Sequence, residues 1–192
     1  MPVRPSPELF AAILCGGSSR RMGRDKALLP HPAGGTLLAH AVALALGRAA
    51  RVVLLSGDGR RYPELGLPEL ADAAAGAGPL GGLVAGLRAA AGAPLLLLPV
   101  DLPYLDPAAL EALIAAHARG GAPLTVASEA GRLSPLPSIW EPACRAAAEA
   151  ALAAGRLALH GLAAEVPHQA VALPTVALRN WNAPADLRDG TA

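Results

Sequence analysis

Three short apolar segments constrain the fold of this chain more than any other feature of its sequence. They cover residues Leu9–Cys15, Arg51–Ser56 and Ala93–Val100, and each is followed directly by glycine or aspartate. Nearly continuous apolar runs of this length are typical of strands buried on both faces of a parallel sheet. Because helical patterns separate them, the sequence predicts strands that alternate with helices.

Capping residues and glycine-rich turns indicate where the helices begin. Thr36 is a suitable N-cap for a helix over residues 37–50, and Asp106-Pro107 combines a cap with a first-turn proline for a helix to Arg119. Further helices are expected over residues 76–91, 141–154 and 156–164, with a final helical turn over 183–187. Shorter strands are expected just before Asp72 and over residues 124–128, 135–140 and 176–180.

These elements predict a single three-layer α/β/α domain over residues 1–192, with a mainly parallel sheet. Ligands bind open sheets of this kind beyond the carboxyl ends of the strands. Polar segments follow all three buried strands, at residues 16–26, at residues 56–59 and at Asp101. We therefore expect these segments to meet in one crevice.

The composition excludes several classes of function. A formal net charge of +1, with one Phe, two Tyr and two Trp, provides neither the basic footprint nor the stacking aromatics of a nucleic-acid binder. Cys15 and Cys144 are far apart in sequence, which favours a reducing cytoplasm and argues against structural zinc. No apolar run approaches the ~20 residues of a spanning helix and no signal peptide is recognisable, so we expect a cytoplasmic protein without a membrane partner.

The segment Leu14-Cys-Gly-Gly-Ser-Ser-Arg-Arg-Met-Gly-Arg-Asp-Lys26 has the residue types of a polyphosphate site. Adjacent glycines let backbone amides approach an anion closely, and the four nearby cations, one of which is the only lysine of the chain, can neutralise it. The spacing fits neither the dinucleotide-binding G-x-G-x-x-G nor a Walker loop. The alternative interpretation is a glycine loop with solvated arginines.

Two further positions favour a metal-assisted reaction. Asp101 ends the most apolar strand, where a carboxylate needs a charged companion, and Mg²⁺ is the usual one beside phosphates. Asn182 offers a hard oxygen near the end of the chain, although it could equally cap a helix. The five histidines do not cluster, and His31 and His40 are expected on loop or helix surfaces.

Taken together, these segments resemble the signature of the molybdenum cofactor guanylyltransferases, which are nucleotidyltransferases with a Rossmann-like, glycosyltransferase-A type fold. Leu14–Lys26 resembles the family's L-A-G-G-x-S-x-R-M-G-x-D-K, with Cys15 in place of Ala. Gly78–Gly82 resembles its G-P-L-x-G, Asp101–Pro103 its D-x-P and Asn180–Pro184 its N-x-N-x-P, all in family order.

The resemblance implies Mg²⁺-dependent transfer of GMP from GTP to the terminal phosphate of molybdopterin, with or without molybdenum, and release of pyrophosphate. It implies that the amino-terminal half binds the nucleotide and that the carboxyl-terminal half faces the pterin. It implies catalytic roles for Arg20, Lys26 and Asp101, and metal binding by Asp101 and Asn182. The implied nucleotide contacts are Leu14, Cys15, Gly16, Gly17, Lys26, Ser56, Asp72, Gly78 and Asp101.

Three alternative functions are compatible with some of these sequence features. A molybdopterin cytidylyltransferase would share the fold and the first motif, and a sugar-phosphate nucleotidyltransferase would share the fold, though many of those have additional domains. A non-catalytic adaptor would keep the pocket without the reaction. For a catalytic protein, the expected partners include molybdenum-insertion proteins, and apo-molybdoenzymes or their chaperones that receive the product.

Overall fold

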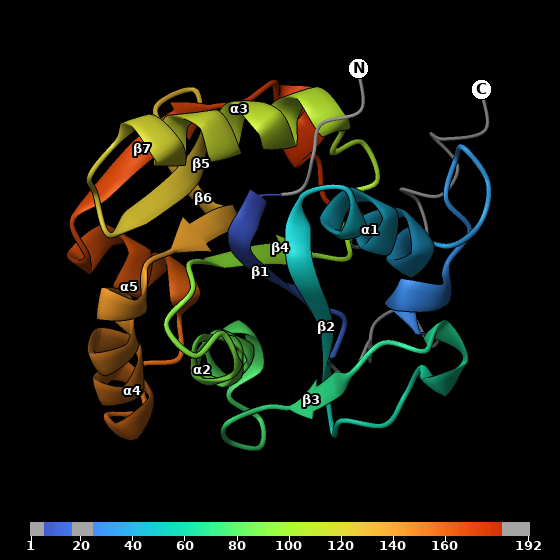
Figure 1. The fold of residues 1–192 in the computed structure, drawn as a ribbon, viewed down its shortest axis with the longest axis horizontal. Coiled ribbons are helices and arrows are strands. Elements are labelled where there is room, and N and C mark those ends of the chain that lie inside the picture. The colour runs from blue at the N-terminus through green and yellow to red at the C-terminus, as the bar shows by residue number, and fades with distance from the viewer. Residues whose placement is uncertain (1–5, 17–24, 182–192) are drawn as a thin grey trace.

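The described residues form seven strands, which all belong to one sheet with the order β3-β2-β1-β4-β6-β5-β7 (Figure 1). The structure is a computed structural model that describes residues 6–16 and 25–181. Within the sheet only β6 runs against its neighbours, because it pairs antiparallel with both β4 and β5. The strands are β1 (Ser6–Leu14), β2 (Ala49–Gly57), β3 (Glu69–Ala71), β4 (Leu95–Pro99), β5 (Leu124–Glu129), β6 (Arg132–Trp140) and β7 (His168–Ala172).

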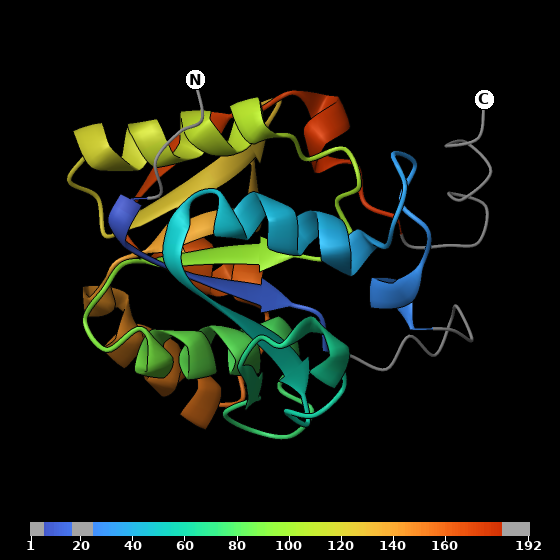
Figure 2. The ribbon, with the colours of Figure 1, turned by 45° about the vertical axis from the view of Figure 1, so that its right-hand side comes forward.

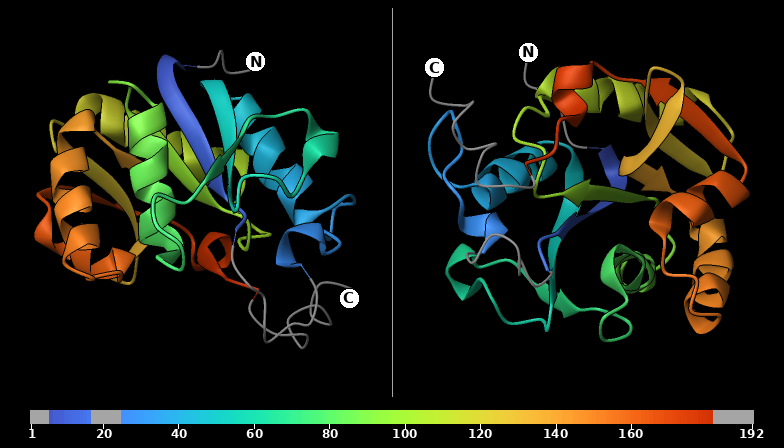
Figure 3. Two further views of the ribbon diagram at one scale, coloured as in Figure 1. Left: turned by 90° about the horizontal axis from the view of Figure 1, so that it is seen from below. Right: turned by 180° about the vertical axis from the view of Figure 1, so that it is seen from behind.

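Helices cover both faces of this sheet, which confirms the predicted three-layer α/β/α architecture. Figure 2 shows α1 and α3 on one side of the sheet and α2 on the other, and α2 and α4 lie side by side in Figure 3. The α-helices are α1 (Leu37–Leu46), α2 (Gly78–Ala89), α3 (Pro107–Arg119), α4 (Arg145–Ala153) and α5 (Leu159–Glu165). Short 3-10 helices are η1 (Lys26–Leu28), η2 (Pro63–Leu65), η3 (Pro142–Cys144) and η4 (Thr175–Leu178).

The central strand β4 shows why a buried strand of this sheet can be apolar along its whole length. Leu96 and Leu98 belong to the hydrophobic core under α1 and α3, whereas Leu95 and Leu97 belong to the core under α2 and α4. All four side chains are fully buried. A strand covered on both faces has no solvent side, so its sequence is apolar throughout.

The first helix is shorter than the sequence predicts. The expected span of 37–50 is wrong at its end, because α1 stops at Leu46 with Gly47 as its C-cap, and β2 already begins at Ala49. Arg48 lies between them with its side chain buried, donating from Nη1 to the Leu44 carbonyl at 3.1 Å and from Nη2 to Glu111 at 3.0 Å. Its guanidinium therefore links the carboxyl end of α1 to Glu111, which lies far along the chain in the helix over Pro107–Arg119.

The last strand lies earlier in the chain than expected. Residues 175–178 form η4 rather than a strand, whereas residues 168–172 form β7, which pairs parallel with β5 at the edge of the sheet. The predicted turn over 183–187 falls outside the described residues. No helix among residues 6–16 and 25–181 has the length and apolar character needed to cross a membrane.

Candidate active site

The carboxyl ends of three neighbouring strands bring the polar segments together. Leu14 at the end of β1 pairs with Leu55 of β2 on one side and with Pro99 of β4 on the other. The residues that follow these strands therefore emerge side by side at one edge of the sheet. This edge is where open parallel sheets bind their ligands.

A cavity of about 470 Å³ opens at this edge between β1, β2 and the start of α2. Four predicted nucleotide contacts, Leu14, Gly16, Asp72 and Gly78, are among its lining residues. Asp58 also lines it, as a member of the segment 56–59 that the sequence places at this edge. The complete lining is Leu14, Gly16, Leu55, Gly57, Asp58, Asp72, Ala75, Gly76, Gly78 and Pro79.

Asp72 is the half-buried carboxyl group of this cavity. It directly follows β3, and its amide donates to the Gly57 carbonyl at 3.0 Å, which ties it to the end of β2. Burial raises the pKa of the Asp72 carboxyl above its ordinary value. A ligand that donates hydrogen bonds to this carboxylate would therefore relieve a desolvation cost.

Gly16 is required by a close approach of two backbones rather than by a ligand. A Cβ at this position would lie 2.6 Å from the Gly57 nitrogen and 2.7 Å from the Ser56 carbonyl carbon. The Gly16 amide already donates to the Leu55 carbonyl at 2.7 Å. The Gly16 N–H is thus bonded within the protein and Gly16 forms part of the cavity wall, while its contact with a nucleotide stays a prediction.

Cys15 and Ser56 turn their side chains into the protein interior. The Cys15 thiol donates to the Leu55 carbonyl at 3.6 Å, and burial raises its pKa to about 12, so it remains a thiol at neutral pH. The Ser56 side chain is only 1% exposed. Either residue could therefore reach a nucleotide only through its backbone.

Lys26 and Asp101 face one another across the same edge. The Lys26 ammonium lies 3.2 Å from Asp101 Oδ2, and the two side chains are 20% and 25% exposed. They are thus partly desolvated and still open to a ligand. The described chain returns to this point at its end, because the Trp181 amide donates to the Asp101 carbonyl at 3.0 Å.

Two histidines hold the loop that follows Asp101. The His31 Nε2 lies 2.7 Å from the Pro103 carbonyl, and the His40 Nε2 lies 2.8 Å from the Leu105 carbonyl. Their rings stack with centroids 4.1 Å apart. The expectation of plain surface positions misses this contact, since nothing near either histidine in the sequence points to residues 103–105.

Three predicted site residues fall outside the described part of the chain. They are Gly17, Arg20 and Asn182. Their roles stay predictions from the motifs. Among the described residues, the edge combines a cavity walled by glycine with a partly exposed pair of a lysine and a carboxylate in an α/β fold.

Comparison with known proteins defines the class of this protein. The MobA-like NTP transferase domain family matches residues 11–169. A "Probable molybdenum cofactor guanylyltransferase" of Rhodopirellula baltica is 36% identical over 197 residues, which cover 97% of this chain and 93% of the relative. The molybdenum cofactor guanylyltransferase of Acidiphilium cryptum is 42% identical over 171 residues, covering 85% and 83%. The chain belongs to the molybdenum cofactor guanylyltransferase family of MobA-like NTP transferases.

A solved structure supports the fold independently. The molybdopterin-guanine dinucleotide biosynthesis protein A of Archaeoglobus fulgidus superposes with a TM-score of 0.79 at 19% identity, covering 94% of this chain and 96% of that one. At this identity the likeness bears on the fold alone. The mainly parallel sheet with helices on both faces is therefore shared with a protein whose sequence has diverged widely.

Proposed function

We propose that this chain is a nucleotidyltransferase that moves GMP from GTP to the terminal phosphate of molybdopterin, assisted by Mg²⁺, and releases pyrophosphate. The observation that carries the proposal is the partly exposed Lys26–Asp101 pair, whose ammonium and carboxylate lie 3.2 Å apart at the same sheet edge as the glycine-walled cavity. Membership of the family indicates the substrates. The cavity and the Lys26–Asp101 pair at this edge have groups that suit the base and the phosphates, respectively.

The cavity suits guanine better than cytosine. Guanine presents two adjacent donors, N1–H and the 2-amino group, which match both oxygens of one carboxylate, whereas cytosine presents a single donor, the 4-amino group, beside acceptors at N3 and O2. Asp72 and Asp58 line the cavity with carboxylates. Because a wrong base would leave such groups unpaired, this arrangement favours GTP over CTP.

Asp101 has the chemistry of a Mg²⁺ ligand in this class of site. Mg²⁺ is commonly held by one or two carboxylates together with substrate phosphates, and it keeps several waters. Asp101 supplies one partly exposed carboxylate, and the described residues contain no cluster of three or more His, Cys, Asp or Glu side chains for a metal. A bound ion would draw the remaining ligands from the triphosphate and, by family resemblance, Asn182, and would neutralise charge on the phosphates.

When GTP binds, Lys26 would give up its contact with the Asp101 carboxylate and bind the phosphates instead. Its ammonium is a compact charge that can follow the negative charge developing on the leaving pyrophosphate, and Arg20 of the same motif would contribute a second cation. The attacking phosphate of molybdopterin is already an anion, so no general base is required. Positioning and electrostatic stabilisation then account for the rate.

The remaining half of the sheet, β6-β5-β7, is the proposed site of the pterin acceptor. In this scheme the protein acts in the cytoplasm and passes its product to apo-molybdoenzymes or their chaperones, after or before molybdenum insertion. Gly17 and Gly78 would contact the nucleotide on the other half.

Pyrophosphate release tests the proposed function directly. Wild-type protein with Mg²⁺ and molybdopterin should release pyrophosphate from GTP and much less from CTP, with release abolished by a chelator. Preference for CTP would instead identify a cytidylyltransferase. Binding of GTP without release would identify an adaptor, and either result would contradict the proposal.

A further inference from the structure

The connection between β2 and β3 touches the chain on both sides of the glycine–arginine motif. The Tyr62 hydroxyl lies 3.1 Å from the Cys15 carbonyl, just after β1, and 2.9 Å from Asp25 Oδ2, just before Lys26. Its single proton can be donated to either oxygen. One side chain thus joins the residue that precedes the motif glycines to the residue that precedes the lysine.

Asp25 divides its two carboxylate oxygens between different tasks. Oδ1 accepts from the Ala27 amide at 3.1 Å and so caps η1, the turn that begins with Lys26. Oδ2 accepts from the Arg61 guanidinium at 2.8 Å and lies 2.9 Å from the Tyr62 hydroxyl. Contacts to Oδ2 therefore decide how Asp25, and with it the start of η1, is oriented.

Glu69 anchors Arg61 and Tyr62 from the neighbouring strand. Its two oxygens accept from the Arg61 amide at 2.7 Å and from the Tyr62 amide at 2.8 Å. Burial alone would raise the pKa of the Glu69 carboxyl, but the two amides, the Ser56 side chain and the charge of Arg61 together outweigh burial, so the pKa lies below its ordinary value. Because Glu69 belongs to β3, the segment is tied to the sheet itself.

Burial makes these contacts stronger than those of an ordinary surface ion pair. The Tyr62 side chain is 1% exposed, and Arg61 and Asp25 are 27% and 22% exposed. The Arg61 guanidinium also lies over the Tyr62 ring, 5.6 Å from its centroid. Charged hydrogen bonds gain strength as water is removed from around them.

We propose that Arg61, Tyr62 and Glu69 are positioning residues, which hold Asp25 and thereby direct the Lys26 ammonium toward Asp101 and the substrate phosphates. The inference rests on the proposed function for its link to catalysis. None of the three lies in the motif segments described above. We name this set, with Asp25, the Lys26 brace.

The sole lysine of the chain gives a direct test of the brace. Acylation of Lys26 by an amine-reactive ester, followed by peptide mass spectrometry, reports how tightly its ammonium is held, without any substrate. Asp101→Asn sets the rate for a lysine that has lost its ion pair with the Asp101 carboxylate. Tyr62→Phe and Arg61→Met should move the rate toward that limit. Arg88→Met is the matched control, because Arg88 pairs with Glu149 at the same 2.8 Å, away from Lys26.

A kinetic cycle connects the brace to turnover. Tyr62→Phe should lower kcat/KM for GTP by about tenfold, the order expected for one hydrogen bond to a charged group. In a Lys26→Ala background the same substitution should have little further effect, because its influence passes through the lysine. Glu69→Gln should show the same pattern more weakly, since it keeps one of the two acceptor oxygens.

The outcomes separate the brace from the proposed function. Folded Tyr62→Phe and Arg61→Met variants with a wild-type acylation rate at Lys26 would overturn the brace. So would effects that add fully to those of Lys26→Ala, which indicate a general structural role. If wild-type protein releases no pyrophosphate from GTP, the proposed function fails, while the acylation rates still decide whether the brace holds Lys26.

Discussion

Two cavities of similar size lie at opposite edges of the sheet, and they differ in how far the charged groups near them are removed from water. The cavity at the carboxyl ends of β1 and β2 measures about 470 Å³, and the one between α4 and α5 about 350 Å³. The second lies at the amino ends of the parallel strands, because Pro123 precedes β5 and Ala143 follows β6, which runs antiparallel.

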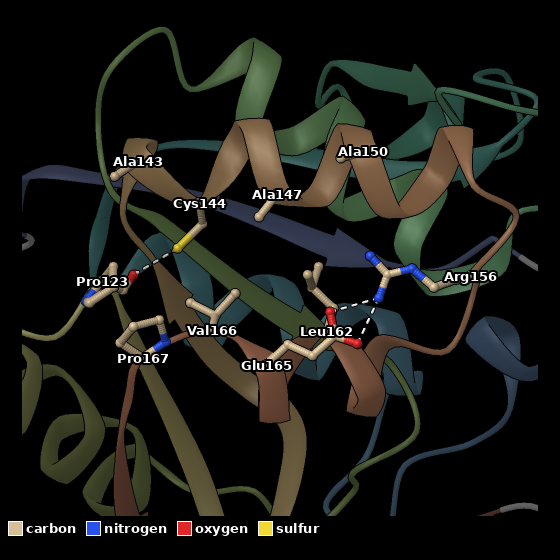
Figure 4. A pocket seen from close by; sticks show the side chains of 10 residues that line it. All are labelled: Pro123, Ala143, Cys144, Ala147, Ala150, Arg156, Leu162, Glu165, Val166 and Pro167. Carbon is tan, nitrogen blue, oxygen red and sulfur yellow. Dashed lines mark hydrogen bonds and ion pairs between the residues drawn. The ribbon is translucent and has the colours of Figure 1, made fainter.

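In the α4–α5 cavity, the hydrogen-bonding side chains shown in Figure 4 are paired with neighbours in the protein. Arg156 donates to both oxygens of Glu165 at 2.6 Å, and the Cys144 thiol donates to the Pro123 carbonyl at 3.1 Å. Burial raises the pKa of that thiol to about 11, so it is inert at neutral pH. Volume alone therefore does not distinguish the two cavities, whereas desolvation does: Arg156 and Glu165 are 53% and 56% exposed, but Lys26 and Asp101 only 20% and 25%.

The largest difference between the two edges should appear in turnover. Lys26→Ala and Asp101→Ala should each lower the rate of pyrophosphate release by about 100-fold or more with the fold intact, since the first removes the cation proposed to bind the phosphates and the second the carboxylate proposed to hold Mg²⁺. Steady-state assays with GTP and circular dichroism measure both effects. Glu165→Gln at the other cavity is the control, and wild-type rates for the Lys26 and Asp101 variants would remove the site assignment.

The close backbone approach at Gly16 should give the next largest effect. Gly16→Ala would force a Cβ to within 2.6 Å of the Gly57 nitrogen, and relieving this clash should destabilise the protein by about 1–3 kcal/mol. Thermal or denaturant unfolding measures the loss. Gly121→Ala is the matched control, because nothing lies within 4 Å of a Cβ there. Equal stability of the two variants would contradict the packing argument.

Replacing the Asp72 carboxyl should increase the stability of the fold and decrease the preference for GTP over CTP. Its folded-state pKa is raised by burial, so the unfolded chain loses the proton first, and ionisation destabilises the fold as pH rises above the ordinary value of 3.8. Asp72→Asn should therefore flatten this part of the curve of unfolding temperature against pH and raise stability at neutral pH. It should also weaken the preference for GTP over CTP. A less stable variant with unchanged preference would refute both parts.

The smallest effect should come from the exposed pair at the α4–α5 cavity. Arg156 and Glu165 are 53% and 56% exposed, and ion pairs in water contribute at most about 1 kcal/mol. Glu165→Gln should change the unfolding free energy by no more than that, with a smaller change at high salt. A large loss of activity in this variant would show that the α4–α5 cavity also takes part in the reaction.

The sequence by itself determined the features that are encoded within a few neighbouring residues. The three apolar runs predict the buried strands β1, β2 and β4, because a strand covered on both faces favours apolar side chains at nearly every position. Asp106 and Pro107 predict the start of α3, and the Asp106 side chain does accept from the Ala109 amide at 2.8 Å. The order of the motifs predicts the family, and parallel strands bring the segments that follow them to one edge.

Only the tertiary structure decided features that depend on distant partners. The end of α1 depends on Arg48 reaching Glu111, and β7 forms at residues 168–172 because β5 offers a free edge there. The Lys26 brace depends on Asp25 meeting Arg61 and Tyr62, which lie more than 30 positions further along the chain. Local patterns cannot specify such contacts, because their free energy depends on burial and geometry that exist only when the sheet has formed.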